Sequence, residues 1–153
     1  MNFLEALERA QNDKEVKNLK NYLLGSLFAS LKPTQKSISE WTLHFYNPET
    51  KNIRNCIVND SITLGNDEPA VSKIKELDMK NAKTQPEELV EKIKTKYKED
   101  PIQILITLHQ KEKLLWNISM ISSGMIINTY NIDAESGEIQ EKKTSSLIQK
   151  FSK

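Results

Sequence analysis

The 153-residue chain has one cysteine, four glycines and few aromatic residues, and each scarcity excludes a class of protein. Cys56, the single cysteine, allows no disulfide within the chain and no zinc site built from several cysteines. The glycines at positions 25, 65, 124 and 137 are isolated from one another. Phosphate-binding loops and dinucleotide-binding fingerprints need several glycines close together. The sequence therefore predicts neither kind of nucleotide site.

No charge of one sign predominates, because 22 Lys and Arg residues nearly balance 21 Asp and Glu residues. A net charge of +1 gives no broad basic surface of the kind that binds nucleic acid or an anionic membrane. Aromatic residues make up only 7% of the chain, and no segment resembles the aromatic and basic strands of an RNA-recognition sheet. We therefore expect no nucleic-acid partner.

Long apolar runs are also absent. The stretch from Tyr22 to Leu31 is among the longest and is far shorter than a membrane span. Residues 1–5 reach a glutamate at once and lack the basic and apolar regions of a secretory signal. We therefore expect no membrane span and a cytoplasmic location. A composition of 37% hydrophobic and 28% charged residues is typical of a globular domain, and this length can bury a core without disulfides.

The first half of the chain predicts helix followed by strands. Apolar residues recur at helical spacing, with a break near Asn12, until Pro33 ends the segment. Alternating apolar residues then indicate strands separated by turn residues. The expected elements are a helical segment over residues 1–31, strands over 41–46, 53–58 and 61–64 with a turn over 47–52, and a connector over 66–83.

The second half predicts the same order. Pro86 suits the first turn of a helix, and Thr84 with Glu87 fits a capping box. After Pro101 the apolar period changes to two, which indicates an antiparallel meander. The expected elements are a helix with Leu89, Val90, Ile93 and Tyr97 on its buried stripe, strands between Ile102 and Ile139, and a helix over 142–151 with Leu147, Ile148 and Phe151 as its apolar face.

These elements predict a fold of the α+β class, with helices packed on an antiparallel sheet in one compact unit over residues 1–153. The shared order predicts two repeated helix-plus-three-strand units, over residues 14–65 and 84–141, joined by the connector 66–83. Trp41 and Trp116 would stand on corresponding strands. A chance similarity of order explains the same pattern equally well.

Reactive side chains are few. Two neighbouring strands could bring His44 to Cys56 as a nucleophile pair, but cysteine is among the residues most often buried as a small hydrophobe. His109 and Glu112 lie near one turn, yet Lys111 between them would repel a metal ion. We therefore expect no catalytic, cofactor-binding or metal-binding residues.

The acidic segment Asp133–Glu138 invites comparison with a calcium loop. An EF-hand loop needs oxygen ligands at alternating positions over twelve residues, and no acidic residue lies at position twelve counted from Asp133. A turn explains each residue type, because Asp133 can accept hydrogen bonds from nearby backbone and Gly137 can adopt a positive φ. We therefore predict a turn.

Two short motifs carry a family resemblance: Trp116-Asn117-Ile118 in a strand, and the segment from Ile132 to Glu138. With a helix over Leu89–Tyr97, residues 84–141 resemble the PepSY-like domain, in which a helix precedes an antiparallel sheet with a tryptophan-led strand. That family's terminal turn reads roughly Ile/Val-Asp-Ala-x-Thr-Gly-Glu, and Ser136 stands here in place of the threonine. The resemblance implies a non-catalytic module, and a role in restraining peptidases has been proposed for some members, which usually occur in secreted or membrane-attached proteins.

Three hypotheses of function follow. The first is a non-enzymatic module that binds a protein partner, which it would regulate, or forms a homo-oligomer. The alternative is a small hydrophobic-ligand carrier with a pocket lined by Trp41, Phe45, Trp116 and Met120, although ordinary core packing explains the same residues. The third is an enzyme with an unrecognised site, in which His44, Cys56 and His109 would be the conspicuous members. No cofactor is expected.

Overall fold

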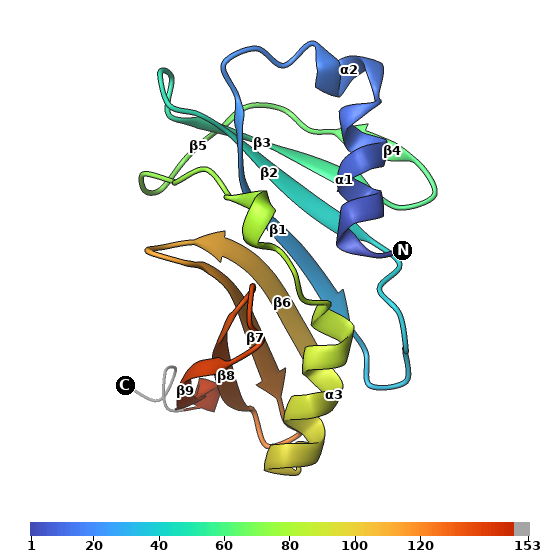
Figure 1. Cartoon of the computed structure of the whole chain (residues 1–153), viewed down its shortest axis with the longest axis vertical. Coiled ribbons are helices and arrows are strands. Elements are labelled where there is room, and N and C mark those ends of the chain that lie inside the picture. The colour runs from blue at the N-terminus through green and yellow to red at the C-terminus, as the bar shows by residue number, and fades with distance from the viewer. Residues whose placement is uncertain (149–153) are drawn as a thin grey trace.

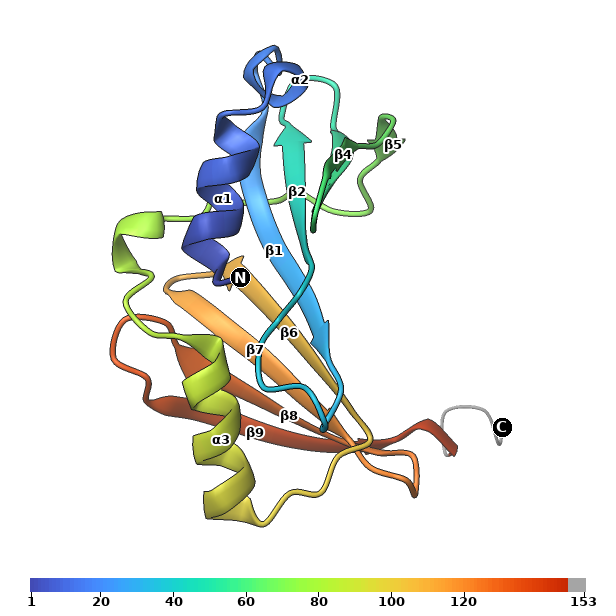
Figure 2. The same ribbon diagram turned by 90° about the vertical axis from the view of Figure 1, so that its right-hand side faces the viewer.

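The computed structural model describes residues 1–148, which form one antiparallel sheet with helices on one of its faces (Figures 1 and 2). The fold is of the α+β class, as expected. None of the helices in this part of the chain is long and apolar enough to cross a membrane. The first half contains α1 (Phe3–Gln11), α2 (Lys14–Lys17), β1 (Leu23–Leu31), β2 (Trp41–Asn47), β3 (Asn52–Val58) and β4 (Ile62–Leu64).

The second half again runs from a helix into strands. The connector holds a short strand and a single 3-10 turn, and the helix and the longer strands follow it. These elements are β5 (Glu68–Pro69), η1 (Met79–Asn81), α3 (Pro86–Tyr97), β6 (Gln103–Gln110), β7 (Leu114–Ile121), β8 (Ile126–Asp133) and β9 (Ile139–Ser146). The sheet order is β4-β3-β2-β1-β6-β7-β8-β9, with β5 paired to β3. The antiparallel strands expected between residues 41 and 64 and between 102 and 139 are confirmed.

The prediction of helix over residues 1–31 is wrong beyond α2. Asn21 has a φ of 65°, which interrupts a helix, and the next residues form β1 at the centre of the sheet. The leucines of this segment lie at helical spacing, but Leu27, Ala29 and Leu31 also recur at every second position, so both periods fit. Because β1 pairs with β2 on one side and β6 on the other, the sheet satisfies its backbone groups and fixes the strand.

The predicted helix over 142–151 is wrong for residues 142–146. They belong to β9, which pairs with β8 from Ile126↔Ser146 to Ile132↔Ile139. The sequence of β9 is polar and mostly exposed, so it lacks the alternation by which a half-buried strand is recognised. Its strand form follows from pairing with the outer edge of β8. Phe151 lies outside the described residues.

The start of α3 differs from the predicted capping box. Gln85 is the N-cap residue and makes no side-chain cap. Thr84 donates its hydroxyl to the carbonyl oxygen of Ala134 at 2.7 Å and accepts the indole N–H of Trp116 at 3.1 Å. The hydroxyl thus satisfies a buried tryptophan instead of the helix end. Pro86 occupies the first turn, as predicted.

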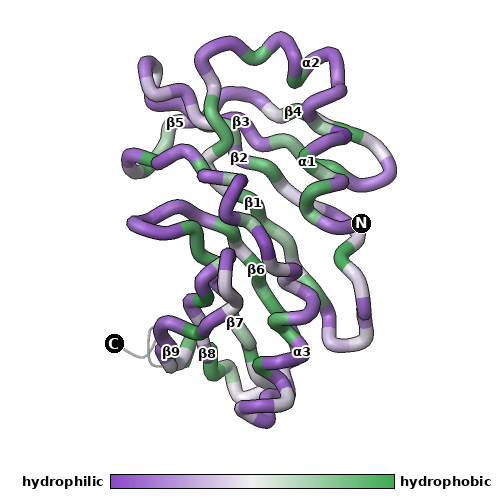
Figure 3. Tube along the Cα trace, in the orientation of Figure 1, coloured by the Kyte–Doolittle hydropathy of each residue, from purple (hydrophilic) through white to green (hydrophobic). Residues whose placement is uncertain are grey.

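The core lies between the sheet and its helices. Trp41 and Trp116, from the two halves of the chain, meet around Phe3, whose ring centroid lies 6.3 and 5.2 Å from theirs. Alternate residues of β1, β2, β6 and β7 complete this layer. Figure 3 shows hydrophobic colours recurring along the central strands, while the loops at their ends are mostly hydrophilic. Burial of these aromatic side chains together with the aliphatic residues of the core is the main source of stability.

Candidate functional site

The face of the sheet opposite α1 and α3 carries no helix (Figure 2). Strand register places alternate side chains of the four central strands on this uncovered face. They are Thr42, His44 and Tyr46 of β2, Ser26, Phe28 and Ser30 of β1, Gln103, Leu105, Thr107 and His109 of β6, and Leu115, Asn117, Ser119 and Ile121 of β7. None of them is Asp, Glu, Lys or Arg, although 28% of the chain is charged. Hydroxyl, amide and imidazole groups stand there among apolar side chains.

Both histidines of the chain lie in one row on this face. Ser26 of β1 is the register partner of His44 on one side and of His109 on the other. The Ser26 hydroxyl oxygen lies 2.6 Å from Nδ1 of His44, within hydrogen-bond distance. Sequence reasoning singled out the two histidines but missed Ser26, because it assigned that segment to a helix.

Cys56 lies on the opposite face of the sheet. It is the register partner of Leu43 and is fully buried beneath the helices. Burial raises the pKa of its thiol to about 11, so the reactive thiolate is scarce at neutral pH. The hypothesis that His44 approaches Cys56 as a nucleophile pair is therefore wrong, because neighbouring positions along β3 point to opposite faces.

The Ser26–His44 pair resembles part of a hydrolytic triad. Such a triad also needs a carboxylate that orients the imidazole and donors that stabilise an oxyanion. Within residues 1–148, the hydrogen bond to Ser26 is the one that the His44 side chain makes. Burial lowers the pKa of His44, which favours its neutral form. A cross-strand hydrogen bond accounts for the pair.

A groove of about 590 Å³ opens at one end of the uncovered face. One wall is the connector from Ser72 to Lys75, and the other is β6 with its turn, from Thr107 to Glu112. The connector comes close because β1 has a glycine there: a Cβ on Gly25 would stand 2.6 Å from the Cγ2 methyl of Ile74. The groove is therefore shaped by a position where any side chain would collide.

His109 stands in this groove with an unusual ring nitrogen. Its Nε2 atom is buried and has no hydrogen-bond partner among the described residues. Burial lowers the pKa of His109, and the nearby charge of Lys111 lowers it further. An unpartnered buried polar atom costs free energy, about 1–3 kcal/mol, and such atoms occur where a ligand or water completes the site.

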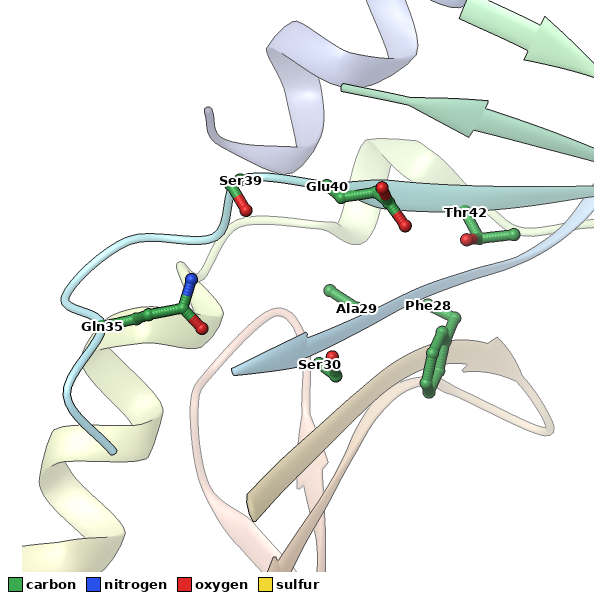
Figure 4. A pocket seen from close by; sticks show the side chains of 7 residues that line it. All are labelled: Phe28, Ala29, Ser30, Gln35, Ser39, Glu40 and Thr42. Atoms are coloured by element: carbon green, nitrogen blue, oxygen red, sulfur yellow. The ribbon is translucent and has the colours of Figure 1, made fainter. Parts of the chain in front are cut away.

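A second hollow, of about 220 Å³, lies near the other end of β1 (Figure 4). Pairing of β1 with β2 stops at Phe28↔Thr42, and the strands separate beyond that point. The loop between them supplies Gln35, Ser39 and Glu40 to the gap. This hollow is small and polar, so it suits water or a short polar group.

The four residues proposed to line a hydrophobic pocket lie in the core on the covered face. Trp41 and Trp116 are fully buried, Met120 is 1% exposed and Phe45 is 8% exposed. The structure brings the two tryptophans together, with ring centroids 6.2 Å apart. None of the four lines the groove or the hollow described above.

The segment Asp133–Glu138 forms the predicted turn. The Asp133 carboxylate accepts the backbone N–H groups of Glu135 at 2.9 Å and Ser136 at 3.4 Å, and Gly137 has a φ of 78°. The hydrogen bond from Glu135 holds the pKa of Asp133 below its usual value, with a further contribution from Lys113. Within residues 1–148, no three His, Cys, Asp or Glu side chains gather closely enough to hold a metal ion.

Comparison with known proteins adds one match. No family model and no curated protein matches the chain. The crystal structure of a presumed lipoprotein from Clostridium difficile 630 superimposes with a TM-score of 0.62 over 95% of this chain and 93% of that one. Sequence identity between the two is 10%. This similarity establishes a shared fold and no shared function.

Proposed function

We propose that this chain is a non-enzymatic module that binds a partner protein through the uncovered face of its sheet and regulates that partner. The observation that carries the proposal is the absence of charged side chains from this face across four neighbouring strands. Cores of protein interfaces are depleted of charged residues, since burying an unpaired charge is costly. A partner that covers this face would desolvate only neutral groups.

The composition of the face also suits recognition. Phe28, Leu105 and Ile121 supply apolar surface, while Thr107 and Asn117 can form hydrogen bonds with a partner. Charged residues such as Glu141 and Lys143 stand farther out, on the edge strand β9. An apolar centre with a charged rim is the usual arrangement of a protein interface.

The proposal includes a repeated architecture of the kind found in PepSY-like domains. One unit would contain α1 with β1 to β4, and the other α3 with β6 to β9, so that β1 and β6 meet at the centre. Trp41 and Trp116 lie on the second strand of their units, which supports the correspondence between the two units. Each unit then has four strands in place of the three predicted, and the units cover residues 3–64 and 86–146 in place of residues 14–65 and 84–141. A cytoplasmic location remains part of the proposal.

The other hypotheses have less support. A carrier of hydrophobic ligands would need space beside Trp41, Phe45, Trp116 and Met120, and these side chains are packed in the core. An enzyme would need the conspicuous residues to converge, and Cys56 is separated from the histidines by the sheet itself. The uncovered face therefore remains the best-supported site.

The test places charges on the uncovered face. Thr107 and Asn117 are register partners, so Thr107→Lys with Asn117→Glu adds an opposite-charge pair that the sheet tolerates. The matched control is Glu91→Lys with Lys94→Glu, which reverses an existing ion pair on α3. Each protein is used to capture partners from lysate of its native host, followed by calorimetry with the purified partner. We expect the face variant alone to lose binding, whereas equal binding by both variants would refute the proposal.

A further inference from the structure

Positive charge is concentrated in the groove between the connector and β6. Lys73, Lys75 and Lys111 line it together with a single acidic residue, Glu112. Three lysines against one glutamate leave a local charge of +2, whereas the whole chain carries +1. None of these lysines forms an ion pair with another described residue. Their charges are thus available to a ligand.

Neutral hydrogen-bonding groups share the groove with these lysines. Ser26, Ser72 and Thr107 contribute hydroxyls, and Ile74 contributes apolar surface. The imidazole of His109 also lines the groove, with its Nε2 atom buried. Lysines together with short hydroxyl side chains form sites for oxyanions, in which an ammonium group acts as a point charge.

We propose that this groove binds a small molecule bearing a phosphate or carboxylate group. The lysines of the connector and of the β6–β7 turn hold the anionic group, and the apolar part of the molecule packs against Ile74. The groove shares Ser26, Thr107 and His109 with the uncovered face. Its lysines lie outside that face, on the connector and the β6–β7 turn, so substitution of the lysines tests anion binding separately from the partner proposed above.

An anion in the groove has a specific consequence for His109. The charged groups around this imidazole are Lys73, Lys75, Lys111 and Glu112, and His44 lies beyond Ser26 in the same row. A bound anion offsets the lysine charges and favours the protonated imidazole, so the pKa of His109 rises on binding. By linkage, acetate, whose charge is the same at pH 6 and pH 8, binds more tightly at pH 6.

The experiment uses NMR spectroscopy of the two histidine side chains, which are the only ones in the chain. Inorganic phosphate and, separately, acetate are titrated at constant ionic strength against chloride. We expect saturable shifts at His109, smaller shifts at His44, and a raised pKa of His109 alone. The double variant Lys73→Gln with Lys75→Gln should weaken binding at least tenfold. The control double variant Lys14→Gln with Lys17→Gln removes the same amount of charge from α2 and should change the affinity for the anion less than twofold.

Each outcome decides the proposal. Saturation by phosphate or by acetate supports it and identifies the preferred anionic group. Shifts that grow linearly without saturation, or equal shifts at both histidines, indicate general salt effects and overturn it. Equal loss of affinity in the two double variants overturns it as well, because binding would then follow net charge and not the groove. Far-UV circular dichroism verifies that every variant is folded.

Discussion

The two faces of the sheet are built from alternate residues of the same strands, yet folding explains only one of them. The covered face is uncharged because helices seal it and large aromatic side chains fill it. The uncovered face is also free of charged residues over its four central strands, although no helix protects it. An antiparallel sheet with one solvated face normally shows polar residues there, with charged ones among them. This difference is the observation on which the proposed partner interface depends.

The largest effect is expected from removing a ring on the covered face. Trp116→Ala deletes the contacts with Phe3 and Trp41 and the hydrogen bond to Thr84. We expect the free energy of unfolding to fall by about 3–5 kcal/mol, the usual cost of truncating a buried aromatic residue. Urea denaturation followed by circular dichroism measures it. The neighbouring substitution Leu115→Ala, on the uncovered face, should cost about 1 kcal/mol or less. Similar losses of stability at the two positions would contradict the view that the covered face stabilises the fold more than the uncovered face does.

The second prediction concerns the place where the connector meets the uncovered face. Gly25→Ala puts a Cβ at 2.6 Å from the Cγ2 methyl of Ile74, so the connector must move. We expect a loss of about 1–3 kcal/mol in the free energy of unfolding, as for overpacking elsewhere. Adding Ile74→Ala should recover part of the loss in a double-mutant cycle. Additive losses would show that the contact does not matter.

The third prediction compares two turns with the same chemistry. Asn47 and Asp133 each accept two backbone N–H groups, and Lys51 and Gly137 follow four residues later with positive φ. A Cβ on Gly137 would make ordinary contact with Thr84 at 3.4 Å and Leu89 at 3.5 Å, so the left-handed φ of 78° sets the cost of a side chain there. Gly137→Ala should therefore lower the free energy of unfolding by about 1–2 kcal/mol. Lys51→Gly relieves a positive φ and should raise the free energy of unfolding by about 1 kcal/mol or less. Thermal unfolding of both variants decides this.

The smallest effect is a pH dependence from the uncovered face. Burial lowers the pKa of His44 and His109 below about 6.5, the value in an unfolded chain. The unfolded state then binds more protons, so the free energy of unfolding falls as the pH decreases below about 6.5. At pH 7.5 both histidines are neutral in both states, and this loss is absent. The urea midpoints at pH 5.5 and pH 7.5 should differ less in the double variant His44→Asn with His109→Gln than in the unsubstituted protein. An unchanged difference would assign the effect to other groups, such as carboxylates.

The candidate site was only partly predictable. His44 and His109 were singled out from the sequence, and alternation in β2 and β6 placed each on the polar side of its strand. Ser26 stands between the two histidines in their row. The strand that carries Ser26 was assigned to a helix because its leucines fit both periods. Cys56 was correctly expected to be buried, but its position opposite the histidines follows from pairing register.

The sequence by itself determined the elements whose signals are local. Alternation indicated β2, β6 and β7, and the turns before β3 and β8 placed those two strands. Pro86 marked the start of α3, and the residues of Asp133–Glu138 dictated a turn, because each of these signals acts within a few residues. Only the tertiary structure decided the strand form of β1 and β9, the use of Thr84 against Trp116, and the groove beside Gly25. In those places the controlling partner is a neighbouring strand or side chain far away in the sequence. Local patterns there are compatible with two structures, and long-range pairing selects one.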